Sequence, residues 1–392
     1  MIDPVNVEAR RKRYGIVFIN AGSLFAQIVQ AAGYPTLLAL LLVQMGLPSW
    51  LMGAILSLQW AVVLFLAPLV PKAMNRFGAR ASSMTGAFLS SLALLLLLAP
   101  ASLPVVTISA FLMGVGLTVR WVGCDTWIVE TVAGHVRGRS ISVHETLMGL
   151  GIAAGPLLTL ASAGNAANAV AAFIALLVLS FLCFGFGPRS SAEHHQGSRN
   201  MNPVRLVFGM VTLALVAALA AGYIETAMVS LLPLYLMSFQ YPEAQALFIL
   251  SVFGLGGTIL QIPLGWLADR WGFRAAQSLC LLLILVGGPC LILMISTDWV
   301  VLIILFAWGG CVGGLNTLAV IEAGSTLPVG LAGTGMALVA SSYTFGGVIG
   351  PALSGATLEL GGGHGAIIVI IGLMAIYGVL LVVSRQQRIR RT

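Results

Sequence analysis

Twelve long apolar stretches dominate this sequence and limit its fold more than any other feature. Each is long enough to cross about 30 Å of hydrocarbon as a helix. Inside a bilayer every backbone polar group must be paired within its own segment, so these stretches are expected to be α-helices. We expect spans at residues 15–43, 48–70, 80–99, 104–131, 138–162, 166–187, 206–238, 243–268, 273–296, 298–325, 331–358 and 363–384.

The composition indicates that most of the surface faces lipid. Only 8% of the residues are charged and 59% are hydrophobic, whereas charged residues make up about a quarter of a soluble domain. The polar first fourteen residues and the long stretch behind them argue against a cleavable signal peptide. The five cysteines all lie in apolar stretches without a CxxC or Cys/His pattern. We therefore expect no disulfide, no metal site and no cofactor.

The distribution of basic residues predicts the orientation of the chain. With a cytoplasmic N-terminus, the cytoplasmic segments hold eighteen of the nineteen Lys and Arg residues and the outward loops hold none. This matches the positive-inside rule, and it supports the count of twelve because a missed span would place later basic residues outside. The net charge of +7 is therefore a signal of topology and not of nucleic-acid binding. A multi-pass protein of the cell inner membrane with both termini in the cytoplasm is expected.

The spans divide into two similar halves. Residues 188–205 form the long polar stretch of the interior and read as a cytoplasmic linker between six-helix bundles at 1–187 and 206–392. The segment NRFGAR at 75–80 recurs as DRWGFR at 269–274, an offset of 194 residues. The pairs Gly155-Pro156 and Gly350-Pro351 recur at an offset of 195. Two landmarks at nearly one offset indicate duplicated units.

The second copy of the recurring segment carries the resemblance to a known family. Gly265-x-Leu267-x-Asp269-Arg270-x-Gly272-x-Arg274 resembles the loop signature of the major facilitator superfamily, in the family's usual place between spans eight and nine. The first copy departs from it, with Pro71 and Asn75 in place of Gly and Asp. Asp125-Thr126-Trp127 followed by Arg137-Gly138-Arg139 is similar to bacterial drug-exporter and uncharacterised transporters. The resemblance implies an all-α fold of two pseudo-symmetric bundles, with the substrate bound between them near the midplane.

The same signature implies a cytoplasmic gate. Asp269 is expected to accept from helix N-terminal N–H groups and from Arg270 or Arg274, in contacts that break when the cytoplasmic side opens. Asn75 cannot supply this charge, so Glu130 is expected to pair with a nearby arginine instead. Solvated charges without a gating role are the alternative. The candidate gate residues are Asp269, Arg270, Arg274, Gly265, Gly272, Asn75, Arg76, Arg80 and Glu130.

Ionisable residues inside the spans are the candidate transport residues, because a charge in the bilayer is costly. Asp125 and His144 lie at similar depth on neighbouring spans, which predicts a polar cluster with Arg120 and Glu145. An internally neutralised structural network is the alternative. Glu225, in a span expected to line the cavity, is the favoured proton carrier. The full set is Glu225, Arg120, Asp125, His144, Glu145, Glu322, Tyr34 and Tyr223. Uncharged hydrogen-bonding capacity comes from Asn20, Gln27, Gln30, Gln59, Gln261 and Asn316, which can alternatively bridge helices.

These observations favour a proton-coupled secondary transporter that moves a small organic solute by alternating access. Gly155-Pro156 resembles an antiporter motif of the family and tilts the expectation towards export. The alternative is an uncoupled or uptake permease for a metabolite or an iron chelate. A receptor of the same fold is less favoured, and the sequence lacks nucleotide-binding and hydrolase motifs, so no enzyme is expected. The expected partners are a small-molecule substrate, protons and the lipid bilayer, with the protein acting as a monomer.

Overall fold

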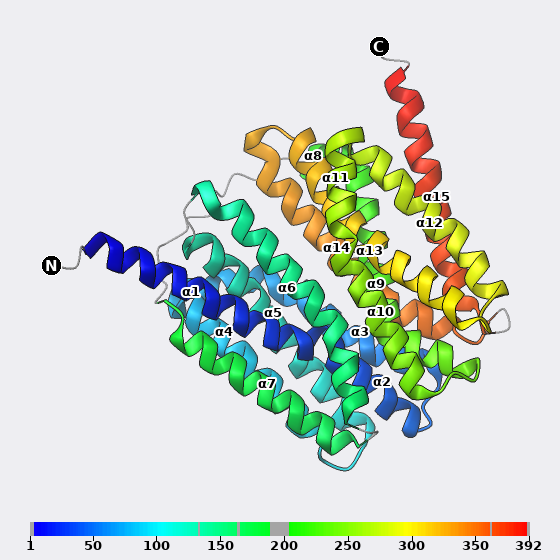
Figure 1. The fold of residues 1–392 in the computed structure, drawn as a ribbon, viewed down its shortest axis with the longest axis horizontal. Helices are drawn as coiled ribbons and strands as arrows, with labels where there is room; N and C mark the ends of the chain where they lie inside the picture. Colours follow the sequence, from blue (N-terminus) through cyan, green and yellow to red (C-terminus); the bar gives the residue numbers. More distant parts are fainter. Residues whose placement is uncertain (1–3, 132–133, 163–164, 189–203, 361–362, 390–392) are drawn as a thin grey trace. The chain divides into compact units, whose positions relative to one another are not determined.

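The computed structural model describes residues 4–131, 134–162, 165–188, 204–360 and 363–389, and this part of the chain is helical throughout apart from short turns (Figure 1). No strand occurs in it. The elements are α1 (Pro4–Gln27), the π segment η1 (Ile28–Gly33), α2 (Tyr34–Gln44), α3 (Ser49–Leu66), η2 (Ala67–Leu69), α4 (Val70–Leu96), α5 (Leu103–Thr131), α6 (Gly134–Ala161), α7 (Ala166–Phe186), α8 (Val204–Met210), α9 (Thr212–Ser238), α10 (Glu243–Ile259), α11 (Gln261–Trp271), α12 (Phe273–Leu293), α13 (Asp298–Thr326), α14 (Val329–Thr357) and α15 (Gly365–Ile389).

The number of membrane spans agrees with the sequence. Within the described residues, eleven helical stretches are long and apolar enough to cross a membrane, and one of them, Ser49–Leu96, is 48 residues long. A single span needs about 20 residues, so this stretch supplies two spans. The expected all-α fold with twelve membrane helices is confirmed.

The recurring loop signature has the same backbone break in both halves. Gly78 (φ 81°, ψ 157°) interrupts α4, and Gly272 (φ 86°, ψ 151°) separates α11 from α12. Residues with a side chain rarely adopt this conformation, and glycine adopts it at little cost. Both segments are helical on either side of the glycine, where the sequence alone predicted loops. The repeat read from the sequence is therefore a repeat of backbone geometry as well.

The second landmark of the repeat also has matching surroundings. A Cβ added to Gly155 of α6 would lie 2.5 Å from the Gly33 nitrogen in the π segment. A Cβ added to Gly350 of α14 would lie 2.5 Å from the Tyr223 carbonyl oxygen on α9. Each glycine thus permits close contact with the first span of its own half, in the way that small residues do in membrane bundles.

The structure divides into two compact units, described separately here. The first comprises Met1–Met45 with Leu58–Ser198, and the second comprises Gly46–Ser57 with Arg199–Thr392. In the first, α4 packs on α5 and α7, α1 packs on α7, and α6 packs on the π segment. In the second, α9 packs on α13 and α14, and α13 also packs on α10 and α12. Most of the linker predicted at 188–205 lies outside the described residues.

The end of α9 in the second unit is joined to the residues that precede α15. The Tyr235 hydroxyl and His364 Nδ1 lie 2.9 Å apart. The imidazole is also stacked on Phe239, with ring centroids 4.5 Å apart. Burial lowers the pKa of His364 below its ordinary value. When Nδ1 carries no proton it accepts from the tyrosine hydroxyl, and when Nδ1 is protonated it donates to the tyrosine oxygen.

Candidate transport site

A buried arginine lies at the centre of the first unit. Arg120 of α5 has no exposed surface. Its Nε donates to Gln30 Oε1 at 2.8 Å, and its Nη2 donates to Gln27 Oε1 at 2.8 Å. Nη1 has Met148 Sδ as its partner, at 3.9 Å. All three acceptors are uncharged, which is unusual for a guanidinium inside a membrane protein.

The close packing of α4 and α5 positions this arginine. A Cβ on Gly86 of α4 would lie 2.6 Å from both the Arg120 nitrogen and the Gly116 carbonyl oxygen. Two facing glycines therefore let the helix backbones approach closely. As a result, the Arg120 side chain can extend within the bundle towards the first span, where its glutamine partners lie.

The glutamine partners lie in the π segment of the first span and directly before it. Gln30 lies in the π segment and Gln27 is the last residue of α1. Gln30 also donates to Ser90 Oγ at 2.6 Å, and its carbonyl oxygen accepts from Gln59 Nε2 at 2.7 Å. Gln30 thus uses its amide oxygen, amide nitrogen and backbone carbonyl together. Short π turns inside α-helices occur frequently at functional sites.

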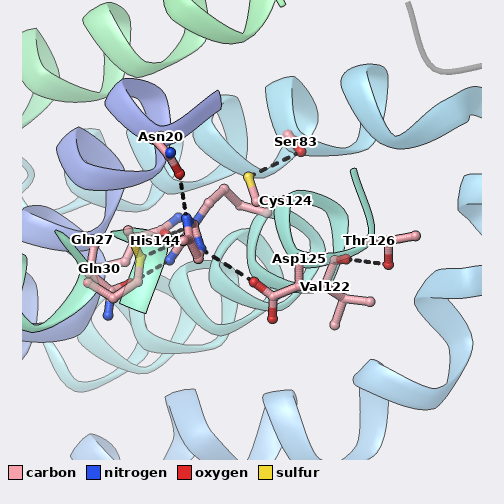
Figure 2. A network of polar contacts seen from close by, with 11 residues as sticks. Asn20, Gln27, Gln30, Ser83, Val122, Cys124, Asp125, Thr126 and His144 are labelled. Atoms are coloured by element: carbon pink, nitrogen blue, oxygen red, sulfur yellow. Dashed lines mark hydrogen bonds and ion pairs between the residues drawn. The ribbon is translucent and has the colours of Figure 1, made fainter. Parts of the chain in front are cut away.

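A second polar group beside the arginine contains the titratable residues of the first unit. Figure 2 shows His144 between Asn20 and Asp125. Its Nδ1 lies 2.9 Å from Asn20 Oδ1, and its Nε2 lies 3.4 Å from Asp125 Oδ1. His144 is buried, whereas 46% of the Asp125 side chain is exposed. The distance from His144 to Asp125 is too long for a good hydrogen bond but suits an ion pair. This contact is therefore favourable when the imidazole is protonated.

The remaining cavity candidates lie apart from this cluster or at its edge. Glu145 is exposed and interacts electrostatically with Asp125 and His144. Tyr34 and Tyr223 are buried, and their hydroxyls lie 2.9 Å from Ser109 Oγ and 3.0 Å from Ser354 Oγ. Each tyrosine joins two helices of its own unit. Glu225 is partly buried on α9 in the second unit.

The duplicated signature uses its last arginine differently in the two halves. Arg80 donates from Nη2 to the Gly185 carbonyl oxygen, near the end of α7. Its counterpart Arg274 lies 3.6 Å from Glu322, measured from Nη2 to Oε1. Glu322 also accepts from Gln277 Nε2 at 2.9 Å and is 4% exposed. Glu322 therefore pairs with Arg274, the last arginine of the loop signature in the second unit.

The other candidate gate residues lie at the surface of their helices. Asn75, Arg76, Asp269 and Arg270 are all exposed. Both of these arginines lie over aromatic rings, Arg76 over Phe77 and Arg270 over Trp266, each at 5.3 Å from the ring centroid. Gly265 has open space beside it. The side chain of Glu130 lies outside the described residues.

Sequence reasoning missed several partners in these networks, among them the serines Ser90, Ser109 and Ser354 and the residues Met148 and Gln277. Met148, the third neighbour of Arg120, gives no signal because methionine is common in apolar spans. Gln277 follows Arg274 by three residues, so its helical spacing places it on the same face. That spacing was the available signal. Among the described residues, no group of three or more His, Cys, Asp or Glu side chains has the arrangement of a metal site.

Comparison with known proteins decides the family. The family model described as "Major Facilitator Superfamily" matches residues 16–287 and 215–391. The chain belongs to the major facilitator superfamily. The match confirms the resemblance to this family that was read from the loop signature.

Two curated transporters are similar in sequence to this chain. The uncharacterized MFS-type transporter YfkF of Bacillus subtilis (strain 168) is 26% identical over 252 residues, which cover 62% of this chain and 63% of the relative. A gallate transporter of Pseudomonas putida is 26% identical over 206 residues, covering 52% of this chain and 45% of the relative. The matches thus span less than two thirds of either relative. Both names agree with the expected class, a membrane transporter and not an enzyme.

Solved structures of two transporters share the fold. The nucleoside transporter NupG has a TM-score of 0.78 at 11% identity, over 94% of this chain and 99% of that one. A D-xylose-proton symporter has a TM-score of 0.77 at 13% identity, over 95% of this chain and 97% of that one. At such low identity these matches concern the fold alone.

Proposed function

We propose that this member of the superfamily is a proton-coupled secondary active transporter that moves a small organic solute by alternating access. The bundles at 1–187 and 206–392 are its two moving parts, and residues 188–205 join them. The proposed setting is the cell inner membrane, with cytoplasmic termini and a single chain as the working unit. Membership of the superfamily supports transport as the activity.

The contact between His144 and Asp125 is the observation that carries the proton-coupling part of the proposal. A carboxylate and an imidazole 3.4 Å apart attract each other when the imidazole carries a proton, and the attraction is lost when it does not. The imidazole is buried and the carboxylate is partly exposed, which gives protons a route to the pair. Because charges inside a membrane bundle are costly, protonation changes which arrangement of the neighbouring helices is stable. Glu225 is proposed as a further proton carrier in the second unit.

The name of one relative indicates a class of solute to test. Gallate is an aromatic carboxylate, and the gallate transporter of Pseudomonas putida aligns with about half of this chain. We therefore include aromatic carboxylates among the trial solutes, beside neutral metabolites and cationic dyes. The expectation of export rests on Gly155-Pro156. The direction of solute flux under an imposed pH gradient tests it.

The experiment is solute flux into proteoliposomes that contain the purified chain, with the inside made acidic, alkaline or equal to the outside. We expect flux that follows the pH gradient and is lost in His144→Gln and in Asp125→Asn. Glu225→Gln tests the proton carrier that is proposed in the second unit. Glu243→Gln is the matched control, because it removes an exposed carboxylate at the start of α10. Flux that ignores both the gradient and these variants would instead indicate an uncoupled permease.

A further inference from the structure

Among the residues that the structure describes, no carboxylate is in direct contact with Arg120. Its described partners are two amide oxygens and a thioether sulfur. The nearest acid in the sequence, Asp125, is directed to His144, as Figure 2 shows. Asp125 acts on Arg120 only through a longer electrostatic interaction. A fully buried cation therefore lies in the bilayer part of the molecule with its charge offset only at a distance.

The hydrogen-bonding capacity of the guanidinium is also only partly used. Arginine has five N–H donors in a planar fork. In the described structure, Nε and Nη2 each donate to one glutamine oxygen, and Nη1 has only the sulfur of Met148 at 3.9 Å. Thioether sulfur is a weak acceptor. The end of the fork formed by Nη1 and Nη2 is thus available to a stronger acceptor.

The surrounding side chains suit an exchange of this sulfur for a ligand. Methionine is unbranched and flexible, so Met148 can move aside at low cost. Gln27 and Gln30 hold the other side of the guanidinium and fix its plane. A planar fork with a fixed orientation matches the two oxygens of a carboxylate and forms parallel charge-assisted hydrogen bonds. Lysine would lack this geometry.

We propose that Arg120 is the site at which the transported solute is bound through a carboxylate group, which replaces Met148 at Nη1 and Nη2. This assignment rests on the transport function proposed above and names its substrate class, small organic acids in their anionic form. Gln27 and Gln30 are positioning residues that orient the guanidinium. The carboxylate supplies the counter-charge that the described protein residues do not place in contact.

The test measures binding to the purified full-length chain by thermal stabilisation in detergent. The probes are acetate, benzoate and 3,4,5-trihydroxybenzoate, each beside its uncharged primary amide. We expect at least one carboxylate to stabilise the wild type, and its amide to bind about tenfold more weakly or worse. If none of the carboxylates binds more tightly than its amide, the assignment is overturned.

Two variants separate anion binding from a structural role of the arginine. Arg120→Gln should lose carboxylate binding, but it also disturbs a buried network. Gln27→Glu keeps Arg120 and provides a resident carboxylate beside it, so it should retain the fold and still bind the carboxylate about tenfold more weakly. Arg205→Gln removes a cation from an exposed position and should bind as the wild type does. Unchanged carboxylate binding in Gln27→Glu would contradict the proposal.

The same variants distinguish this assignment from the proposed function. Gradient-driven flux of an uncharged solute that survives Arg120→Gln would leave proton-coupled transport standing and refute the carboxylate site. The opposite result is carboxylate binding that depends on Arg120 in a protein whose flux ignores the pH gradient. That result would support the carboxylate site and refute proton-coupled transport.

Discussion

Gln30 joins several helices of the first unit through its side chain and backbone. Its side chain and carbonyl connect Arg120, Ser90 and Gln59, which belong to three other helices. Each of these groups is buried, so each needs the partner that Gln30 supplies. The glutamine was recognisable from the sequence as an uncharged polar group in a span. Its three partners were not, because they depend on how the helices meet.

Replacement of this glutamine should weaken the first unit. Gln30→Leu leaves Arg120 Nε and Ser90 without their described partners, and an unsatisfied buried group costs roughly 1–3 kcal/mol. We expect a clear fall in the apparent melting temperature in detergent. Gln44→Leu is the matched control, because Gln44 is exposed at the end of α2. Equal melting temperatures for the two variants would show that the network contributes little to stability.

His364 should make the stability of the second unit depend on pH. Burial lowers its pKa in the folded protein, so the unfolded chain binds more protons once the pH falls below about 6.5. The stabilising contribution is complete above that value and is lost as the pH falls towards the folded pKa. Between about pH 7.5 and about pH 5.5, the wild type should lose more thermal stability than His364→Gln. A parallel decline in both proteins would refute this role.

At the scale of helices, the π segment decides where the polar side chains of the first span point. One inserted residue rotates the following positions by about 100° relative to a regular helix. Hydropathy is the same for either geometry, so the sequence predicted a continuous span at 15–43 and could not predict the contact of Gln30 with Arg120. By contrast, Asp125 and His144 were expected at similar depth from a simple count along two antiparallel helices, and they are in contact.

The packing of α6 on the π segment gives a prediction at this scale. Gly155→Ala places a Cβ 2.5 Å from the Gly33 nitrogen and 2.7 Å from the Ile28 carbonyl oxygen. The helices must separate, and such overpacking costs typically about 1–3 kcal/mol. Gly372→Ala is the control, because Gly372 of α15 has open space beside it. Alanine there should leave the melting temperature unchanged or raise it, since glycine within a helix costs roughly 0.5–1 kcal/mol.

At the scale of the molecule, the order of the spans and the repeat were predictable because both follow from local signals. Apolar length marks each span, and the glycines of the repeat mark the same backbone break twice. The networks that join helices were less predictable, since a side chain in a span has several possible neighbours. Glu322 illustrates this limit. Its charge was conspicuous in the sequence, but its contact with Arg274 depends on the packing of α12 on α13.

The proposed topology can be tested with reporter fusions along the chain. Alkaline phosphatase, which is active only outside the cytoplasm, should be active when fused after residue 100 or residue 240. It should be inactive when fused after residue 188, where the chain is expected to be cytoplasmic under the positive-inside rule. A green fluorescent protein at the C-terminus should fluoresce. An active phosphatase after residue 188 would invert or refute the assigned orientation.

The different partners of Arg80 and Arg274 have a consequence for how each contact can be lost by mutation. The partner of Arg80 is a backbone carbonyl, whereas the partner of Arg274 is the carboxylate of Glu322. A side-chain substitution at residue 322 can therefore remove the partner of Arg274, whereas no side-chain substitution at residue 185 removes the carbonyl oxygen that Arg80 contacts. Of the two copies of this arginine, only the one in the second half depends on the chemistry of another side chain.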